Sequence, residues 1–174
     1  MFVQVGKTAP GFTLDALVGQ EFKKISLSDY KDKKWVILFF YPLDFTFVCP
    51  TEILEFSKRA NEFEEMNAVI LGASIDSIYS HKAWTKELGE LSYPLLSDIT
   101  QEVARTYGVL IEEKGHALRG LYIIDPEGTL RYELVHDLSV GRSVDETLRV
   151  LKALQSGELC PVGWKPGQKT LGKA

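Results

Sequence analysis

The strongest constraint on the fold is an apolar run at residues 35–41, which is followed closely by Cys49 and Pro50. A continuous apolar run of this length is typical of a strand that is buried on both faces of a sheet. After Pro50, apolar side chains recur at intervals of three and four as far as Phe63, which predicts an amphipathic helix over residues 50–66. The pattern therefore predicts a central strand that leads into a helix, with a cysteine at the junction.

The position of Cys49 in this junction favours a reactive sulfur. Proline suits the first helical position, because its missing N–H would have no partner there. We therefore expect Pro50 at the first helical position and Cys49 at the N-cap. The sulfur would then face unpaired backbone N–H groups and the positive end of the helix dipole, both of which favour the thiolate over the thiol. A buried structural cysteine is the alternative.

The remaining segments alternate between strand and helix patterns. Strands are expected at residues 12–17, 21–26, 68–75, 93–98, 118–124 and 129–135, and helices at residues 80–88, 101–107 and 144–155. Turn residues at 18–20 and 126–128 join two pairs of these strands into hairpins. In the helix at 80–88, we expect Ala83, Trp84 and Leu88 to face the core. This alternation predicts an α/β fold, with a central mixed sheet flanked by helices.

Composition argues against several classes of function. The 174 residues are 45% hydrophobic and 25% charged, which is ordinary for a soluble globular domain. The net charge of −4 and the scattered Lys and Arg give no case for nucleic acid. The longest apolar run is too short to span a bilayer, and the N-terminus lacks the features of a signal peptide. We therefore expect a cytoplasmic protein without a membrane or nucleic-acid partner.

The length fits one domain, but the character of the chain changes near its end. From residue 156 onward, three glycines and two prolines occur without any periodicity. We therefore predict a main domain at residues 1–155 and a C-terminal arm at residues 156–174.

The cysteines and histidines do not predict a metal site or a disulfide framework. Cys49 and Cys160 are the two cysteines of the chain. They cannot complete a four-ligand zinc site, and the histidines at 81, 116 and 136 lack the short spacings of zinc ligands. Without export signals, two cysteines are also unlikely to form a structural framework. We expect no metal and no cofactor.

A strand that delivers a cysteine to the start of a helix is the arrangement of thioredoxin. Thr46 occupies the position three residues before Cys49, where a C-x-x-C motif would have its other cysteine. The Thr46 hydroxyl can hydrogen-bond to the sulfur, or to an oxygen bound beside it. A thiolate beside a hydroxyl and a cation suits attack on an O–O bond, which gives a sulfenic acid. Cys160 could then condense with that sulfenic acid to form a disulfide.

Arg119 lies in one of the predicted apolar strands. An unpaired charge would be costly there, so a buried partner or an anionic site is expected beside it.

Several motifs resemble one known family. Residues 42–50, with the pattern P-x-x-x-T-x-x-C-P, resemble the active-site motif of the peroxiredoxins. Residues 160–166, CPVGWKP, resemble the tail of the typical 2-Cys branch, which includes bacterial alkyl hydroperoxide reductase C. Matching segments at 119–125 and 140–148 extend the resemblance over nearly the whole chain. The resemblance implies a thioredoxin-like fold with an N-terminal hairpin and a C-terminal arm.

The resemblance also implies roles for individual residues. Cys49 would be the peroxidatic nucleophile, and Cys160 the resolving cysteine. Thr46 would hold the peroxide by a hydrogen bond, while Pro42 would pack over the thiolate and limit access of water. Arg119 would stabilise the thiolate and the charge that develops on oxygen in the transition state.

Glu52 and Arg142 resemble residues that orient the active-site arginine. In this branch the resolving cysteine comes from the other subunit of a homodimer, and dimers commonly assemble into decamer rings. The implied reaction reduces hydrogen peroxide and organic hydroperoxides, with electrons from thioredoxin or a flavoprotein disulfide reductase.

Two other functions stay open on the sequence. Thiol–disulfide exchange on proteins fits the thioredoxin-like core, although the missing C-x-x-C motif counts against it. A chaperone-like holdase built from ring assemblies is a secondary role of some members of the family.

Overall fold

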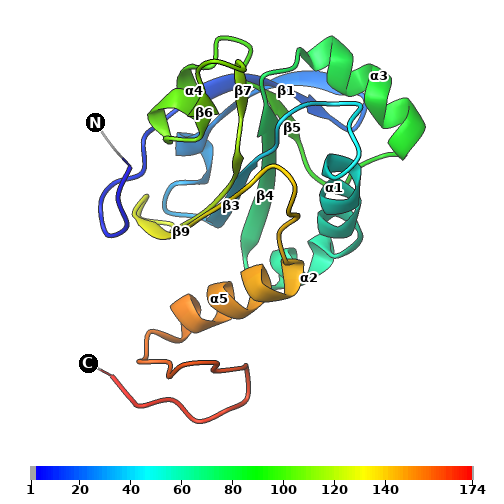
Figure 1. The fold of residues 1–174 in the computed structure, drawn as a ribbon. Coiled ribbons are helices and arrows are strands. Elements are labelled where there is room, and N and C mark those ends of the chain that lie inside the picture. Colours follow the sequence, from blue (N-terminus) through cyan, green and yellow to red (C-terminus); the bar gives the residue numbers. More distant parts are fainter. Residues whose placement is uncertain (1–2, 174) are drawn as a thin grey trace. The chain divides into compact units, whose positions relative to one another are not determined.

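The computed structural model describes residues 3–173, and their contacts divide the chain into two units, 1–142 and 143–174. The first unit contains a seven-stranded mixed sheet (Figure 1). In spatial order its strands are β2 (Glu21–Ser26), β1 (Thr13–Val18), β5 (Leu95–Ser97), β4 (Ala68–Ser74), β3 (Trp35–Phe40), β8 (Arg119–Ile124) and β9 (Leu130–His136). Strands β3, β4 and β5 are parallel to one another, and the other neighbouring pairs are antiparallel.

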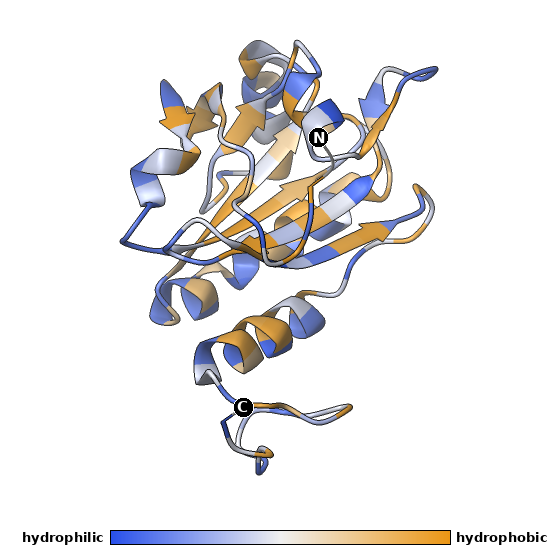
Figure 2. Ribbon diagram, turned by 90° about the vertical axis from the view of Figure 1, so that its left-hand side faces the viewer, coloured by the Kyte–Doolittle hydropathy of each residue, from blue (hydrophilic) through white to orange (hydrophobic). Residues whose placement is uncertain are grey.

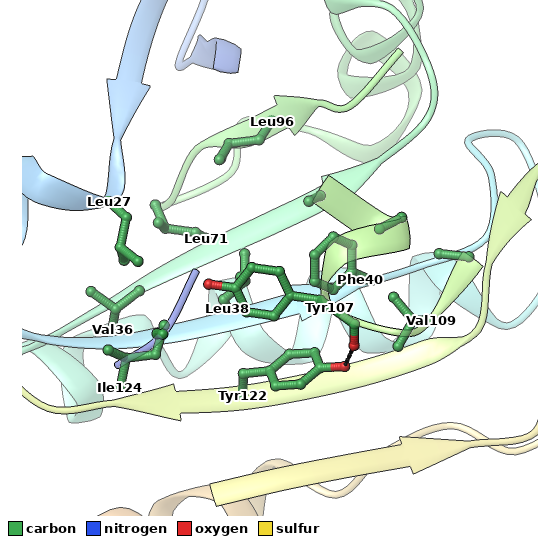
Figure 3. Close-up of a cluster of buried hydrophobic side chains, with 14 of the residues drawn as sticks. Leu27, Val36, Leu38, Phe40, Leu71, Leu96, Tyr107, Val109, Tyr122 and Ile124 are labelled. Carbon is green, nitrogen blue, oxygen red and sulfur yellow. Dashed lines mark hydrogen bonds between the residues drawn. The ribbon is translucent and has the colours of Figure 1, made fainter. Parts of the chain in front are cut away.

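Strand β3 is the centre of the core, as the apolar run predicts. All of its residues after Trp35 are buried, and Figure 2 shows the central strands in largely hydrophobic colours. Alternate side chains point to opposite faces of a strand. On one face, the Phe39 ring stacks on Phe56 at 4.9 Å between centroids. On the other face, Phe40 joins a cluster that includes Tyr107 and Tyr122 (Figure 3).

Both predicted hairpins are confirmed. Strands β1 and β2 pair in antiparallel register from Thr13 opposite Ser26 to Val18 opposite Glu21. Strands β8 and β9 also pair antiparallel, and the turn between them is closed by hydrogen bonds to Asp125 from the backbone N–H groups of Gly128 and Thr129.

The other elements complete the first unit around this sheet. They are the 3₁₀ helix η1 (Leu27–Tyr30), helices α1 (Cys49–Lys58), α2 (Ala60–Glu65), α3 (Ile78–Leu88) and α4 (Glu102–Thr106), and a small hairpin of β6 (Leu110–Ile111) and β7 (His116–Ala117). Within the described residues, no helix combines the length and the apolar character needed to cross a membrane.

Three local predictions were wrong. The single helix expected over 50–66 is two helices, because the backbone leaves helical geometry at Arg59, where φ is −107° and ψ is 14°. Helix α1 also begins one residue earlier than expected, so Val48 is the N-cap and Cys49 the first helical residue. In α3, Trp84 is buried but Ala83 is exposed, because the buried face of that helix also contains His81 and Thr85.

The second unit consists of helix α5 (Val144–Ser156) and an irregular segment. The Ser143 side chain caps α5 by accepting a hydrogen bond from the Glu146 N–H, and the helix ends at Gly157, whose φ is +65°. Beyond it, the backbone of Leu159 pairs with Leu171 and Gly172, which closes the segment into a loop. The predicted domain boundary after residue 155 stays a prediction.

Candidate active site

The site is built around the first turn of α1. Cys49 has no exposed surface, and Pro50 follows it as the second helical residue. The Thr51 and Glu52 N–H groups donate to the Val48 carbonyl oxygen, which fixes the start of the helix. The sequence therefore places the cysteine at a helix start correctly, although one position further into the helix than expected.

Arg119 is the cation beside this sulfur. It is the first residue of β8 and is 3% exposed. Its Nη1 lies 3.4 Å from the Cys49 Sγ and 2.7 Å from the Glu52 Oε2, and its Nε donates to the Leu138 carbonyl oxygen at 2.8 Å. A guanidinium this close favours negative charge on the sulfur. The expected buried partner of Arg119 is therefore Glu52.

Glu52 is held by a second arginine. Arg142 donates from Nε to the Glu52 Oε1 at 2.8 Å and from Nη2 to Oε2 at 2.9 Å, and its backbone N–H also reaches Oε1. Burial alone would raise the pKa of Glu52. The hydrogen bonds and charge of Arg142, together with the charge of Arg119, outweigh that cost, so the pKa lies below its ordinary value. Glu52 is thus an ionised carboxylate between two guanidinium groups.

Arg142 also ties this cluster to the sheet. Its Nη1 donates to the carbonyl oxygens of Phe40 at 2.7 Å and Gly120 at 2.6 Å, which belong to neighbouring strands β3 and β8. Its guanidinium lies over the Phe39 ring, 5.2 Å from the centroid. Such a fixed fork of donors is typical of buried arginine. The cluster is therefore anchored to the rigid centre of the fold.

The loop between β3 and α1 carries the other predicted site residues. Pro42 is buried, and Thr46 is half-buried. The Thr46 hydroxyl donates to the Leu43 carbonyl oxygen at 2.9 Å, so its remaining capacity is that of an acceptor. Phe45, between them, has a φ of +57°, which is unusual for a residue with a side chain.

Cys160 lies in the second unit. It is partly exposed, and both cysteines of the chain are free thiols. Oxygen atoms surround its sulfur at long distances: the Ser156 Oγ and the Glu158 carbonyl at 3.7 Å, and the Ala153 carbonyl at 3.9 Å. The first unit therefore brings together Cys49, Thr46, Pro42, Arg119, Glu52 and Arg142, whereas Cys160 belongs to the other unit.

A polar group beside the loop was missed by the sequence reasoning. Asp44 and His81 are both buried and lie in hydrogen-bonding contact. The available signal was an acidic residue between two apolar ones, Leu43 and Phe45. Within residues 3–173, no group of three or more His, Cys, Asp or Glu side chains is arranged to hold a metal ion.

Comparisons with known proteins show the family of the chain. The model of the AhpC/TSA family matches residues 5–133, and that of the C-terminal domain of 1-Cys peroxiredoxin matches residues 153–174. The chain is 55% identical to a chloroplastic 2-Cys peroxiredoxin, BAS1, of Hordeum vulgare, over 96% of this chain and 84% of the relative. It is 54% identical to peroxiredoxin prdx-2 of Caenorhabditis elegans, over 96% of this chain and 88% of the relative.

Solved structures give the same result. The reduced 2-Cys peroxiredoxin of Plasmodium vivax superposes with a TM-score of 0.93 at 42% identity, covering 95% of this chain and 91% of that one. AhpC of Mycobacterium tuberculosis superposes with a TM-score of 0.85 at 42% identity, covering 95% and 100%. The fold and the cysteine site together define a thiol peroxidase with a thioredoxin-like core. The chain belongs to the AhpC/TSA family and is a peroxiredoxin.

Proposed function

We propose that Cys49 is the peroxidatic cysteine of this enzyme. The observation that carries the proposal is the guanidinium of Arg119, 3.4 Å from a fully buried sulfur. The Cys49 thiolate attacks one oxygen of the peroxide, an S–O bond forms, and the O–O bond breaks. The other oxygen leaves with a proton as water or an alcohol, and Cys49 is left as a sulfenic acid.

Thr46 positions the peroxide as a hydrogen-bond acceptor. Its hydroxyl proton is committed to the Leu43 carbonyl oxygen at 2.9 Å, so the oxygen has lone pairs to accept the O–H of a bound hydroperoxide. Pro42, buried within the same loop, limits access of water to the thiolate. Holding the reacting atoms in line in this way lowers the entropic part of the barrier.

Arg119 stabilises the thiolate and the negative charge that moves onto the leaving oxygen. Glu52 and Arg142 act through it. Because Arg142 holds both carboxylate oxygens of Glu52, that carboxylate presents a fixed oxygen to the Arg119 Nη1 at 2.7 Å. The guanidinium is thus positioned before the peroxide arrives.

Cys160 resolves the sulfenic acid. Its thiolate attacks the Cys49 sulfur, a disulfide forms, and the sulfenic oxygen leaves as water. We propose that the attacking Cys160 belongs to the partner in a homodimer and that the dimers assemble into a decamer ring. The support is the resemblance of residues 160–166 to the typical 2-Cys branch and the similarity to 2-Cys peroxiredoxins. One relative, modified at its N-terminus, forms an artifactual octamer.

A gel and a variant test this assignment. Oxidised wild-type protein should migrate as a disulfide-linked dimer without reductant, and Cys160→Ser should abolish that band. The variant should reduce one equivalent of peroxide and then stall when thioredoxin is the electron donor. A monomeric oxidised band would show that the resolving bridge is intrachain, and sustained turnover by the variant would show that Cys160 does not resolve.

We propose a cytoplasmic enzyme that takes electrons from thioredoxin or from a flavoprotein disulfide reductase and needs no cofactor of its own. Its substrates are hydrogen peroxide and organic hydroperoxides. The decisive measurement is peroxide consumption with each of the two donors in parallel, with insulin reduction as the comparison. Insulin reduction without peroxide consumption would identify a protein disulfide exchanger and overturn the peroxidase assignment.

A further inference from the structure

A buried polar network lies directly beside the loop that precedes Cys49. Asp44, 6% exposed, accepts hydrogen bonds from the Tyr41 hydroxyl at 2.8 Å and from the Ser80 hydroxyl at 2.8 Å. The Nδ1 of His81 lies 2.8 Å from the Asp44 Oδ2, and its Nε2 lies 3.1 Å from the Leu96 carbonyl oxygen. His81 has no exposed surface. The network thus joins the loop to α3 and to β5.

The contacts show which groups donate and which accept hydrogen bonds in this network. A carbonyl oxygen can only accept, so the His81 Nε2 carries a hydrogen for Leu96. Burial and the nearby Asp44 raise the pKa of Tyr41 well above its ordinary value, so the Tyr41 hydroxyl keeps its proton and donates it. Asp44 therefore receives hydrogen bonds from two hydroxyls, and its Oδ2 also pairs with the His81 Nδ1. Both ring nitrogens of His81 thus have a polar partner, the Asp44 carboxyl group at Nδ1 and the Leu96 carbonyl oxygen at Nε2.

The backbone of the loop is held at the same point. The Asp44 N–H donates to the Asp76 Oδ2 at 2.9 Å, and the Ser74 hydroxyl holds that oxygen at 2.7 Å. Phe45, the next residue, has a φ of +57°. Left-handed backbone at a bulky residue is strained, and it persists only where the surroundings enforce it. Asp44 supplies these contacts from both its side chain and its backbone.

A contribution to the stability of the fold does not by itself explain this buried network. A buried polar or ionic pair often stabilises a fold no better than apolar residues of similar volume, because its polar groups must leave water. Asp44 lies two residues before Thr46 and five before Cys49 in the sequence. Its position suggests that it is kept for the conformation of the loop.

We propose that the His81–Asp44 pair is a positioning device for the peroxide-binding loop. It holds Asp44 against β5 and α3, and so sets the place of Thr46 relative to the Cys49 sulfur. The proposal rests on the proposed role of Cys49 and Thr46 in peroxide reduction. The pair does not contact the sulfur, and the Arg119–Glu52–Arg142 cluster is separate from it. Its loss should therefore misplace the peroxide and leave the reactivity of the thiolate unchanged.

The test compares two reactions of the same sulfur in His81→Gln. The rate constant for oxidation of Cys49 by hydrogen peroxide should fall about ten- to a hundredfold, because small misplacements of reacting groups have effects of this size. Alkylation of Cys49 by iodoacetamide, which needs the thiolate but no peroxide alignment, should stay within about twofold of wild type. Ser80→Ala, which removes a single hydrogen bond to Asp44, should show the same split to a smaller extent.

Asp44→Asn is the conservative rescue. An asparagine amide can donate to the Nδ1 of a neutral His81, which still donates from Nε2 to Leu96. This variant should retain the peroxide rate to within about threefold, whereas Asp44→Ala should lose about as much as His81→Gln. Tyr122→Phe, which removes the buried hydrogen bond from the Tyr122 hydroxyl to the Tyr107 carbonyl oxygen, controls for stability. It should lower the melting temperature and leave both rates unchanged.

Three results would overturn the inference. Equal losses of peroxide oxidation and alkylation would show that the pair acts through the thiolate. Full peroxide rates in His81→Gln and Ser80→Ala, with only a lower melting temperature, would show a purely structural pair. An Asp44→Asn variant as slow as Asp44→Ala would show that charge matters rather than hydrogen-bond geometry. Failure of the proposed function is distinct, because wild-type Cys49 itself would then be alkylated but not oxidised by peroxide.

Discussion

The two cysteines of this chain occupy opposite kinds of environment. Cys49 has no exposed surface, begins a helix, and has a guanidinium 3.4 Å from its sulfur. Cys160 is partly exposed in a segment without helix or strand, and the described contacts of its sulfur are oxygens at 3.7–3.9 Å. One sulfur is fixed by charge and by the core of the sheet. The other lies in an irregular segment against the end of α5.

This contrast separates two requirements of a thiol peroxidase. Attack on an O–O bond needs donors and charges that are in place beforehand, because reorganising them during the reaction raises the barrier. Resolution needs a thiol that can leave its resting position and reach a second sulfur. Local stability is lowest where few buried contacts hold the backbone.

Removing the Cys49 sulfur should have the largest effect. Cys49→Ser should abolish peroxide reduction, because a serine hydroxyl without a strong base is not a nucleophile at neutral pH. Stopped-flow peroxide consumption measures the loss, and Cys160→Ser, which retains one turnover, is the matched control. Residual turnover in Cys49→Ser would show that another group reacts with peroxide. The assignment of peroxide reduction to Cys49 and of resolution to Cys160 would then be wrong.

Removing the cation should have the next largest effect. Arg119→Met should lower the rate of Cys49 oxidation about 10²–10³-fold, the usual effect of deleting one preorganised donor. The control is Arg131→Met, because Arg131 pairs with Asp125 at 3.1 Å from an exposed position and should leave the rate unchanged. If Arg119→Met reacts at the wild-type rate, the helix start alone activates the sulfur.

Glu52→Gln should reduce stability in a way that depends on pH. The variant leaves two buried guanidinium groups without their carboxylate, which costs about 3–5 kcal/mol of unfolding free energy at pH 7. Folding lowers the pKa of Glu52 below the unfolded value of about 4.3, so the stabilisation is complete above about pH 5 and is lost as the pH falls through the folded value. The difference between wild type and variant should therefore shrink on acidification.

Denaturant unfolding at several pH values measures this difference. Glu112→Gln is the control, since Glu112 pairs with Arg105 at an exposed site and should leave stability nearly unchanged. A gap that stays constant from pH 7 down to pH 3 would mean that Glu52 is not the ionised member of the cluster.

The smallest effect is expected in the arm. Arg149 pairs with Glu146 and donates to the Trp164 carbonyl oxygen at 2.9 Å, which fastens the loop around Cys160 to α5. Arg149→Ala should speed disulfide formation after oxidation about two- to tenfold, because loss of the hydrogen bond to Trp164 loosens the loop. Quenched-flow trapping followed by non-reducing gels measures the rate, and Arg105→Ala is the surface control. Slower resolution would show that the fastened loop is the reactive conformation.

The strands and turns were predictable from the sequence because their signals are local. The apolar run at 35–41 and the turn residues at 18–20 and 126–128 set β3 and both hairpins. The break at Arg59 was not predictable, because apolar spacing continues across it from Phe56 to Phe63 and their rings still meet, 5.9 Å apart. Apolar periodicity predicts which face of a helix is buried. It does not predict where the backbone angles depart from helical values.

The site was predictable in its residues and much less in its connections. Cys49, Thr46 and Arg119 could be selected by motif and by an out-of-place charge. The bond between Arg142 and the Phe40 and Gly120 carbonyl oxygens depends on strand order, which no local pattern contains. The orientation of the His81 ring depends equally on a carbonyl oxygen of β5. Every residue has a backbone carbonyl oxygen, whatever its side chain. The sequence therefore does not show which of these oxygens accepts a hydrogen bond.

The complete burial of Cys49 affects oxidation and disulfide formation differently. The reactive end of a peroxide is two oxygen atoms, whereas a second cysteine arrives attached to a polypeptide. A disulfide therefore requires the Cys49 sulfur to become exposed, and opening the first turn of α1 for this purpose would break the hydrogen bonds to the Val48 carbonyl oxygen and separate Cys49 from Arg119. The same contacts that hasten oxidation delay resolution. We therefore expect the lifetime of the sulfenic acid to increase with the stability of the first turn of α1.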